Sequence, residues 1–69
     1  MDARHLRYFL AVVDHGGFHR AAEALAVGQP TLTQAVAALE RELHSTLFHH
    51  VGADVVLTEA GRALVGPAR

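Results

Sequence analysis

Apolar residues recur at helical spacing along the first part of the chain, interrupted by short breaks that contain glycine. The first run predicts a helix over residues 1–14, with Asp2 placed to cap its start. The sequence His15-Gly16-Gly17 ends it, because paired glycines break helices and supply left-handed backbone positions. The apolar stripe of this helix consists of Leu6, Phe9, Leu10 and Val13.

The next two runs predict a pair of helices joined by a tight turn. Residues 18–25 form a compact helix, residues 26–28 break it, and a longer helix extends to Leu43 with Gly28 as its N-cap. This arrangement is the helix-turn-helix pattern, which we place at residues 18–37. The stripes of the two helices consist of Phe18, Ala21, Ala22 and Leu25, and of Leu32, Ala35, Val36, Leu39 and Leu43.

The longer helix begins with a cluster of amide and hydroxyl side chains, Gln29, Thr31, Thr33 and Gln34, opposite its apolar stripe. Pro30 fits in the first turn, where a missing N–H costs nothing. Such side chains suit a helix whose first turn reads base edges in a DNA groove, and the N-terminal backbone N–H groups attract phosphate. The alternative is an ordinary amphipathic helix with a polar start.

The pattern changes after Leu43. Alternating apolar residues predict a small β-hairpin, or wing, over residues 48–57, with Gly52-Ala53-Asp54 as its turn. Thr58 then caps a last helix, which we expect Gly61, Gly66 and Pro67 to weaken. The fold class is therefore mainly α, with a predicted core of Leu6, Phe9, Leu10, Phe18, Ala22, Leu25, Val36, Leu39, Leu43, Phe48 and Leu57.

Composition sets the limits on these predictions. With 69 residues and 51% apolar content, the chain forms one small domain. It has no cysteine for disulfides or thiolate metal sites. No apolar run is long enough to span a membrane, and no signal pattern opens the chain, so we expect a cytoplasmic protein at the nucleoid with no membrane partner.

The residues give no pattern of catalysis or metal binding. Ser45 follows His44, but nothing orients the two as a nucleophile and its base. His44, His49 and His50 suggest a histidine metal sensor, yet they lack the spacing of a metal site. We therefore expect no enzyme activity, no metal and no cofactor.

Two strings of this sequence resemble a known family. AAE-x-L-x-V-x-QP-x-L-[ST] (from Ala21) and LE-x-EL-x-x-x-LF (from Leu39) resemble the N-terminal DNA-binding domain of LysR-type transcriptional regulators, and LTEAG (from Leu57) resembles the start of their linker helix. The resemblance implies a winged helix-turn-helix over residues 1–57, followed over 58–69 by the start of a linker helix.

The resemblance also implies a function and partners. It implies a bacterial regulator that binds double-stranded DNA with an inverted repeat, as a homodimer paired through the linker helix. A small-molecule effector would bind a C-terminal domain that lies outside these 69 residues. The residues carried over as the DNA-facing start of the recognition helix are Gln29, Pro30, Thr31, Thr33 and Gln34.

Other positions depart from the family pattern. His50 stands where a wing arginine is usual, Ala53 and Asp54 where further basic residues are frequent, and Gln34 and Ala37 where Arg or Lys is common. His50 and Ala37 remain candidate DNA contacts by position. Arg20, near the start of the second helix, either contacts a phosphate or is a surface charge.

The charge balance makes these departures important. Six Arg and no Lys face seven acids, for a net charge of −1, whereas nucleic-acid binders usually have a basic surplus. We therefore predict weaker and less salt-sensitive DNA binding than in a typical relative. A protonated histidine at position 50 would restore one contact. The alternative is a protein-interaction or dimerisation module on a winged-helix scaffold with weak DNA affinity.

Overall fold

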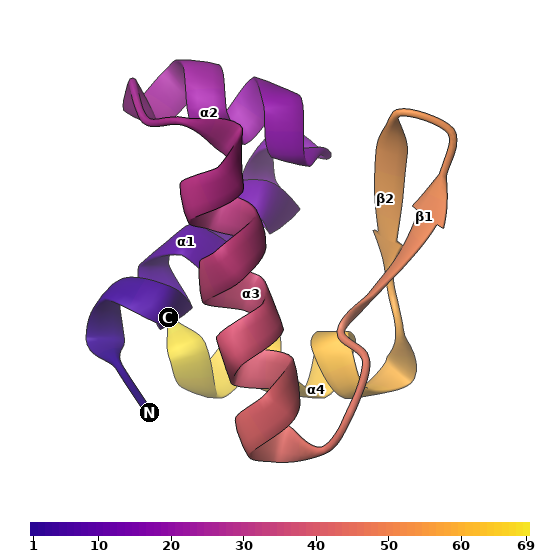
Figure 1. Cartoon of the computed structure of the whole chain (residues 1–69). Helices are drawn as coiled ribbons and strands as arrows, with labels where there is room; N and C mark the ends of the chain where they lie inside the picture. Colours follow the sequence, from indigo (N-terminus) through magenta and orange to yellow (C-terminus); the bar gives the residue numbers. More distant parts are fainter.

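The computed structural model describes all 69 residues and contains four helices and a two-stranded antiparallel sheet (Figure 1). It confirms the predicted fold class, mainly α with a helix-turn-helix and a wing. The elements in chain order are α1 (Ala3–His15), α2 (Phe18–Leu25), α3 (Gln29–Leu43), β1 (Phe48–Val51), β2 (Asp54–Leu57) and α4 (Glu59–Ala68).

Local chemistry explains where α1 begins and ends. The Asp2 carboxylate accepts a hydrogen bond from the backbone N–H of Arg4 at 2.8 Å, which confirms the predicted cap. This bond lowers the pKa of Asp2 below its usual value. Gly16 ends the helix in the left-handed conformation, with φ at +75°. The helix therefore starts and stops slightly later than the 1–14 prediction.

Two helices end on residues other than glycine in the left-handed conformation. Ala26 has φ at +56° after α2, and His44 has φ at +52° after α3. Ala26 redirects the chain into the start of α3, where Gly28 is the N-cap and Pro30 lies in the first turn. Val27 packs against the core at this corner.

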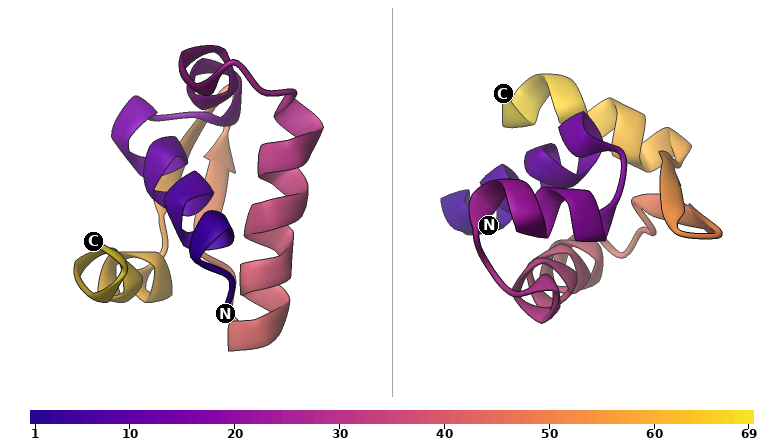
Figure 2. Two further views of the ribbon diagram at one scale, coloured as in Figure 1. Left: turned by 90° about the vertical axis from the view of Figure 1, so that its left-hand side faces the viewer. Right: turned by 90° about the horizontal axis from the view of Figure 1, so that it is seen from above.

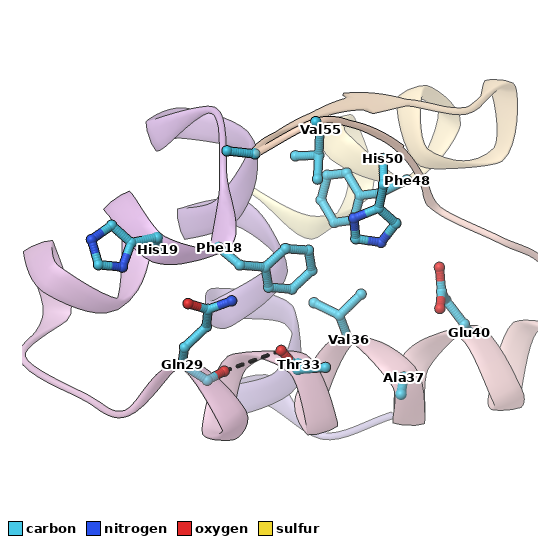
Figure 3. A pocket seen from close by; sticks show the side chains of 12 residues that line it. Phe18, His19, Gln29, Thr33, Val36, Ala37, Glu40, Phe48, His50 and Val55 are labelled. Atoms are coloured by element: carbon cyan, nitrogen blue, oxygen red, sulfur yellow. Dashed lines mark hydrogen bonds between the residues drawn. The ribbon is translucent and has the colours of Figure 1, made fainter.

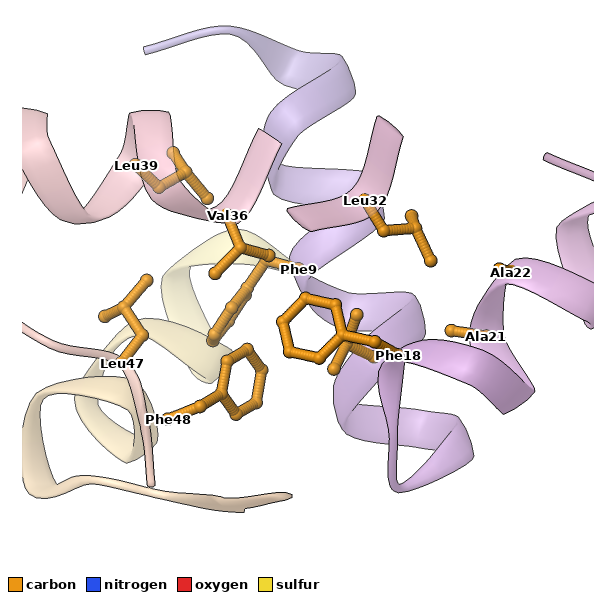
Figure 4. Close-up of a cluster of buried hydrophobic side chains, with 10 residues drawn as sticks. Phe9, Phe18, Ala21, Ala22, Leu32, Val36, Leu39, Leu47 and Phe48 are labelled. Atoms are coloured by element: carbon orange, nitrogen blue, oxygen red, sulfur yellow. The ribbon is translucent and has the colours of Figure 1, made fainter. Parts of the chain in front are cut away.

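The core fills the space between α1, α2, α3 and the start of β1 (Figure 4). Phe9 contacts Phe48 with ring centroids 5.4 Å apart, and Phe18 meets Phe48 edge-on at 5.7 Å. The buried cluster consists of Phe9, Val12, Phe18, Ala21, Ala22, Leu32, Val36, Leu39, Leu47 and Phe48.

The predicted core was wrong at Leu25, which is 41% exposed. Leu25 is the last residue of the short α2, and the chain turns away at Ala26 before another element covers it. Leu47 is fully buried but was not predicted, because it lies in an irregular segment without periodicity. The predicted core residues that are only half-buried, at the core's edge, are Leu6, Leu10, Leu43 and Leu57.

The wing pairs Phe48 with Leu57 and Val51 with Asp54 in antiparallel register. Asp54 therefore belongs to β2, and only Gly52 and Ala53 form the turn, with Gly52 at φ +62°. Because side chains alternate along a strand, one face of the hairpin carries Phe48, His50, Val55 and Leu57.

Helix α4 packs on α1, which lies between α4 and α3 (Figure 2). Thr58 caps α4 by accepting from the N–H of Gly61 at 3.0 Å, and its hydroxyl donates to the carbonyl of Thr46 at 2.6 Å. The helix continues through Gly61 and Gly66, so the expected weakening does not interrupt it. None of the four helices is long and apolar enough to cross a membrane.

Candidate nucleic-acid interface

The start of α3 presents its polar side chains to solvent. Leu32, Ala35 and Val36 are buried and fix the orientation of the helix, which leaves the opposite side exposed. Thr33 donates its hydroxyl hydrogen to the carbonyl of Gln29 at 3.2 Å and keeps its oxygen lone pairs as acceptors. The predicted contact residues that are exposed together here are Gln29, Pro30, Thr31, Thr33 and Gln34.

A groove of about 420 Å³ separates α3 from the wing (Figure 3). Apolar side chains line part of it, among them Phe18, Val36 and Val55. Ala37 is half-buried and lines the groove. As an alanine it contributes only a methyl group, where an arginine or lysine could extend toward DNA. The polar residues that line the groove are His19, Gln29, Thr33, Glu40 and His50.

His50 lies on the groove side of the wing. Its ring stacks on Phe18 with centroids 5.9 Å apart and 19° between the planes. The residue remains exposed, so the imidazole is accessible at the mouth of the groove. Sequence reasoning placed His50 on the wing but missed its aromatic partner, which lies 32 positions earlier in the chain.

Arg20 reaches from α2 to the wing. Its Nε donates to the carbonyl of His15 at 2.8 Å, and its Nη2 donates to the carbonyl of Gly16 and to Asp54 Oδ1, both at 2.7 Å. The candidate phosphate contact therefore already holds a carboxylate. The sequence placed Asp54 in the turn of the wing and as a departure from the family pattern, but nothing local links it to Arg20.

Glu40 is an acidic residue of the groove to which the sequence assigned no role. Its Oε2 accepts from the backbone N–H of Leu47 at 2.8 Å and so fixes the connection between α3 and β1. The carboxylate is half-buried and adds negative charge to the lining of the groove. The histidines do not join other ligands, since no three His, Asp or Glu side chains gather where they could hold a metal ion.

Residues 3–62 match the family described as "Bacterial regulatory helix-turn-helix protein, lysR family". The chain belongs to the LysR family. Among curated LysR relatives, it is 42% identical over its whole length to the HTH-type transcriptional regulator TfdT of Cupriavidus pinatubonensis. It is 48% identical, over 91% of the chain, to BudR of Klebsiella aerogenes. The match covers 30% of TfdT and 44% of BudR, so the chain spans less than half of these relatives.

Solved LysR-family structures match the whole fold. The DNA-binding domain of CbnR in complex with DNA superposes with a TM-score of 0.95 at 39% identity, covering 100% of this chain and 79% of the other. The BenM DNA-binding domain with its benA site 1 DNA gives 0.90 at 38% identity, covering 99% and 79%. The 69 residues therefore form a LysR-family helix-turn-helix DNA-binding domain, and this family consists of transcriptional regulators rather than enzymes.

The end of the domain that carries the start of α3 and the tip of the wing has little free positive charge. Within α2, the first turns of α3 and the wing, Arg20 is the only arginine, and it is paired with Asp54. On α2, the Nε2 atom of His19 lies 3.5 Å from the Oε1 atom of Glu23, so this histidine also has an acidic neighbour. Polar but uncharged groups therefore dominate the surface at the start of α3.

Proposed function

We propose that this domain binds an inverted-repeat operator as a homodimer, with the start of each α3 in the major groove. The supporting observation is the exposed polar turn at Gln29–Gln34, held outward by the buried face of the same helix. The wing tip lies at the same end of the molecule as this turn, while α4 lies at the opposite end (Figure 1). This arrangement leaves α4 free to pair with a second subunit while α3 and the wing face DNA.

The chemistry of the turn suggests a role for each residue. Gln29 and Gln34 carry amides that can contact adenine in a bidentate manner, and Thr33 offers a hydroxyl oxygen and a methyl group to the base edges. Pro30 and Thr31 lie in the first turn of α3 and would face the DNA at its edge, near the phosphates. Arg20 would face the DNA backbone. The groove between α3 and the wing would present Ala37 and His50 to the DNA.

The homodimer sets the geometry of the operator. Two α3 helices related by a twofold axis read half-sites about one or two helical turns apart. The structures of CbnR and BenM with DNA support the DNA-binding mode by similarity. A small-molecule effector would act through a domain outside these 69 residues, and the structure of the relative LysG was solved with arginine bound as effector.

Fluorescence anisotropy tests this proposal. The chain is titrated against a duplex from its own upstream region and a scrambled duplex, at two salt concentrations. We expect tighter binding to the upstream duplex, weakened by salt. Equal binding to both duplexes would contradict operator recognition, and absence of binding would favour the protein-interaction module.

A pair of threonine variants makes the test specific to α3. Thr33→Ala removes a hydroxyl at the proposed interface and should weaken binding to the upstream duplex by about 1 kcal/mol, at the lower end of the range for a base contact. Thr46→Ala makes the same chemical change at an exposed residue beyond α3 and should leave binding unchanged. Equal effects of the two variants would argue against the assigned face.

A further inference from the structure

The side chain of Arg20 is held in place before any DNA arrives. Two backbone carbonyls, of His15 and Gly16, accept hydrogen bonds from its guanidinium, so the group cannot swing freely. Its Nη1 makes no hydrogen bond within the chain, and the side chain is 54% exposed. The guanidinium is thus preorganised, and Nη1 still has no partner within the chain.

Asp54 brings its carboxylate to this group from the wing. Its Oδ1 lies 2.7 Å from Arg20 Nη2, and its side chain is 61% exposed. The surrounding backbone is close as well, because a Cβ on Gly17 would lie 3.3 Å from the carbonyl oxygen of Ala53. The tip of the wing therefore packs against the turn between α1 and α2, and the ion pair between Arg20 and Asp54 joins the two segments.

The location of the pair points to a competing ligand. In helix-turn-helix proteins the first helix of the motif crosses the DNA backbone, and α2 is that helix here. Phosphate and carboxylate oxygens accept from guanidinium in the same way, through short charge-assisted hydrogen bonds. A phosphate that approaches the start of α2 would therefore compete with Asp54 for Nη2 of Arg20.

We propose that Asp54 acts as an internal substitute for a DNA phosphate at Arg20, and that DNA binding exchanges one for the other. The inference rests on the proposed DNA-binding mode and identifies Asp54 as the residue that limits affinity. In the exchange Arg20 gains a phosphate while Asp54 loses its cation. Because the freed carboxylate stays beside the DNA, Arg20 and Asp54 together add no net positive charge at this contact, so the net counterion release is close to zero.

Substitution of Asp54 separates this exchange from a purely structural pair. Asp54→Asn keeps the size of the side chain and removes its charge, so Arg20 is free for phosphate. We expect the slope of log affinity against log salt to steepen by about 0.9, with severalfold tighter binding at low salt. In the double variant with Arg20→Ala, the slope should return to the wild-type value.

Asp14→Asn is the matched control. Asp14 also forms an exposed ion pair with an arginine, Arg69, at 2.6 Å, but it belongs to the contact between α1 and α4. This variant loses the same charge and should leave the salt slope unchanged. Thermal unfolding monitored by circular dichroism verifies that each variant is folded.

The remaining outcomes are decisive. The exchange would be overturned if Asp54→Asn left the slope of log affinity against log salt unchanged. It would also be overturned if Asp54→Asn steepened this slope equally in the wild type and in the Arg20→Ala variant. Because phosphate contacts are independent of sequence, the slopes are also measured with the scrambled duplex. Equal binding of both duplexes would thus defeat the operator proposal while the exchange is still tested. Failure of every variant to bind either duplex at low salt would overturn both.

Discussion

Gly61 occupies the point where α4 crosses the segment that leads into the wing. A Cβ at this position would overlap the carbonyl oxygen of Leu47 and lie 2.8 Å from Leu57 Cδ2. In the sequence Gly61 looks like a defect in a helix, since glycine lowers helix propensity. In the structure it permits the close approach that seats α4 on the domain.

Gly61→Ala should therefore destabilise the domain. We expect a loss of about 1–3 kcal/mol, toward the upper end because a backbone rather than a flexible side chain must move. Gly66→Ala is the control, since no atom lies within 4 Å of the added methyl group. Its propensity gain of about 0.5–1 kcal/mol is opposed by the clash of a residue that precedes proline, so its net effect should be small. Chemical denaturation of both variants measures the difference.

Asp14 gives the domain a defined response to acid. Its hydrogen bond with Arg69 lowers the pKa of the carboxyl below the ordinary value of 3.8 and raises the pKa of the Arg69 guanidinium. A lowered pKa in the folded state means that the ion pair stabilises the fold above the unfolded pKa. The contribution is lost as the pH falls through the folded pKa.

Asp14→Asn should thus be less stable than the wild type at neutral pH. The two proteins should converge in stability as the pH falls below 3.8 and the wild-type carboxyl becomes protonated. Thermal unfolding at a series of pH values measures this convergence. A stability difference that stays constant down to the most acidic value would contradict the assigned pair.

At the scale of the elements, α2 and α3 illustrate how far periodicity can be used. Leu25 and Leu39 both belong to apolar stripes, yet Leu39 is fully buried whereas Leu25 is 41% exposed. The stripe identifies the inner face of a helix but does not say how far the neighbouring elements extend along it. Burial at a helix end depends on tertiary contacts.

Alanine substitution should separate the two leucines. Leu39→Ala leaves a cavity in the core, so we expect a loss of about 2–5 kcal/mol. Such a loss is large for a domain of this size. Leu25→Ala should cost much less, because most of the deleted surface is already in water. Similar melting temperatures for the two variants would show that the core is wrongly assigned.

Helix starts, breaks and the wing were predictable because their signals are local. Asp2, Gly16 and Thr58 act where the sequence placed them, within a few residues of the groups that they cap or release. The contacts that were missed join distant positions, such as Arg20 with Asp54. No spacing rule links residues 34 apart, so this part of the candidate site required the assembled fold.

At the scale of the whole molecule, little free positive charge lies near the start of α3 and the wing. The chain has a net charge of −1, and two of its six arginines, Arg20 and Arg69, form ion pairs with aspartates. Affinity for DNA depends strongly on the number of phosphates that cations neutralise. Because the four unpaired arginines lie outside α2, the first turns of α3 and the wing, DNA binding should rely more on the polar contacts of α3.

His50→Arg tests this view of the whole surface. A permanent cation on the wing should tighten DNA binding and steepen the salt slope by about 0.9. Ala3→Arg adds the same charge at the first residue of α1, at the opposite end of the molecule from the start of α3, and should change the slope little. Anisotropy titrations over a range of salt compare the variants. Equal slopes for both would mean that net charge, rather than its position, controls binding.

The aromatic rings form a series that runs from the core to the wing surface. Phe9 contacts Phe48, Phe48 contacts Phe18, and Phe18 stacks on His50. The imidazole protons of His50 therefore lie within the ring current of Phe18, and their NMR resonances report whether the wing is seated. The chemical shifts of the His50 ring protons can therefore be followed during a DNA titration to detect movement of the wing.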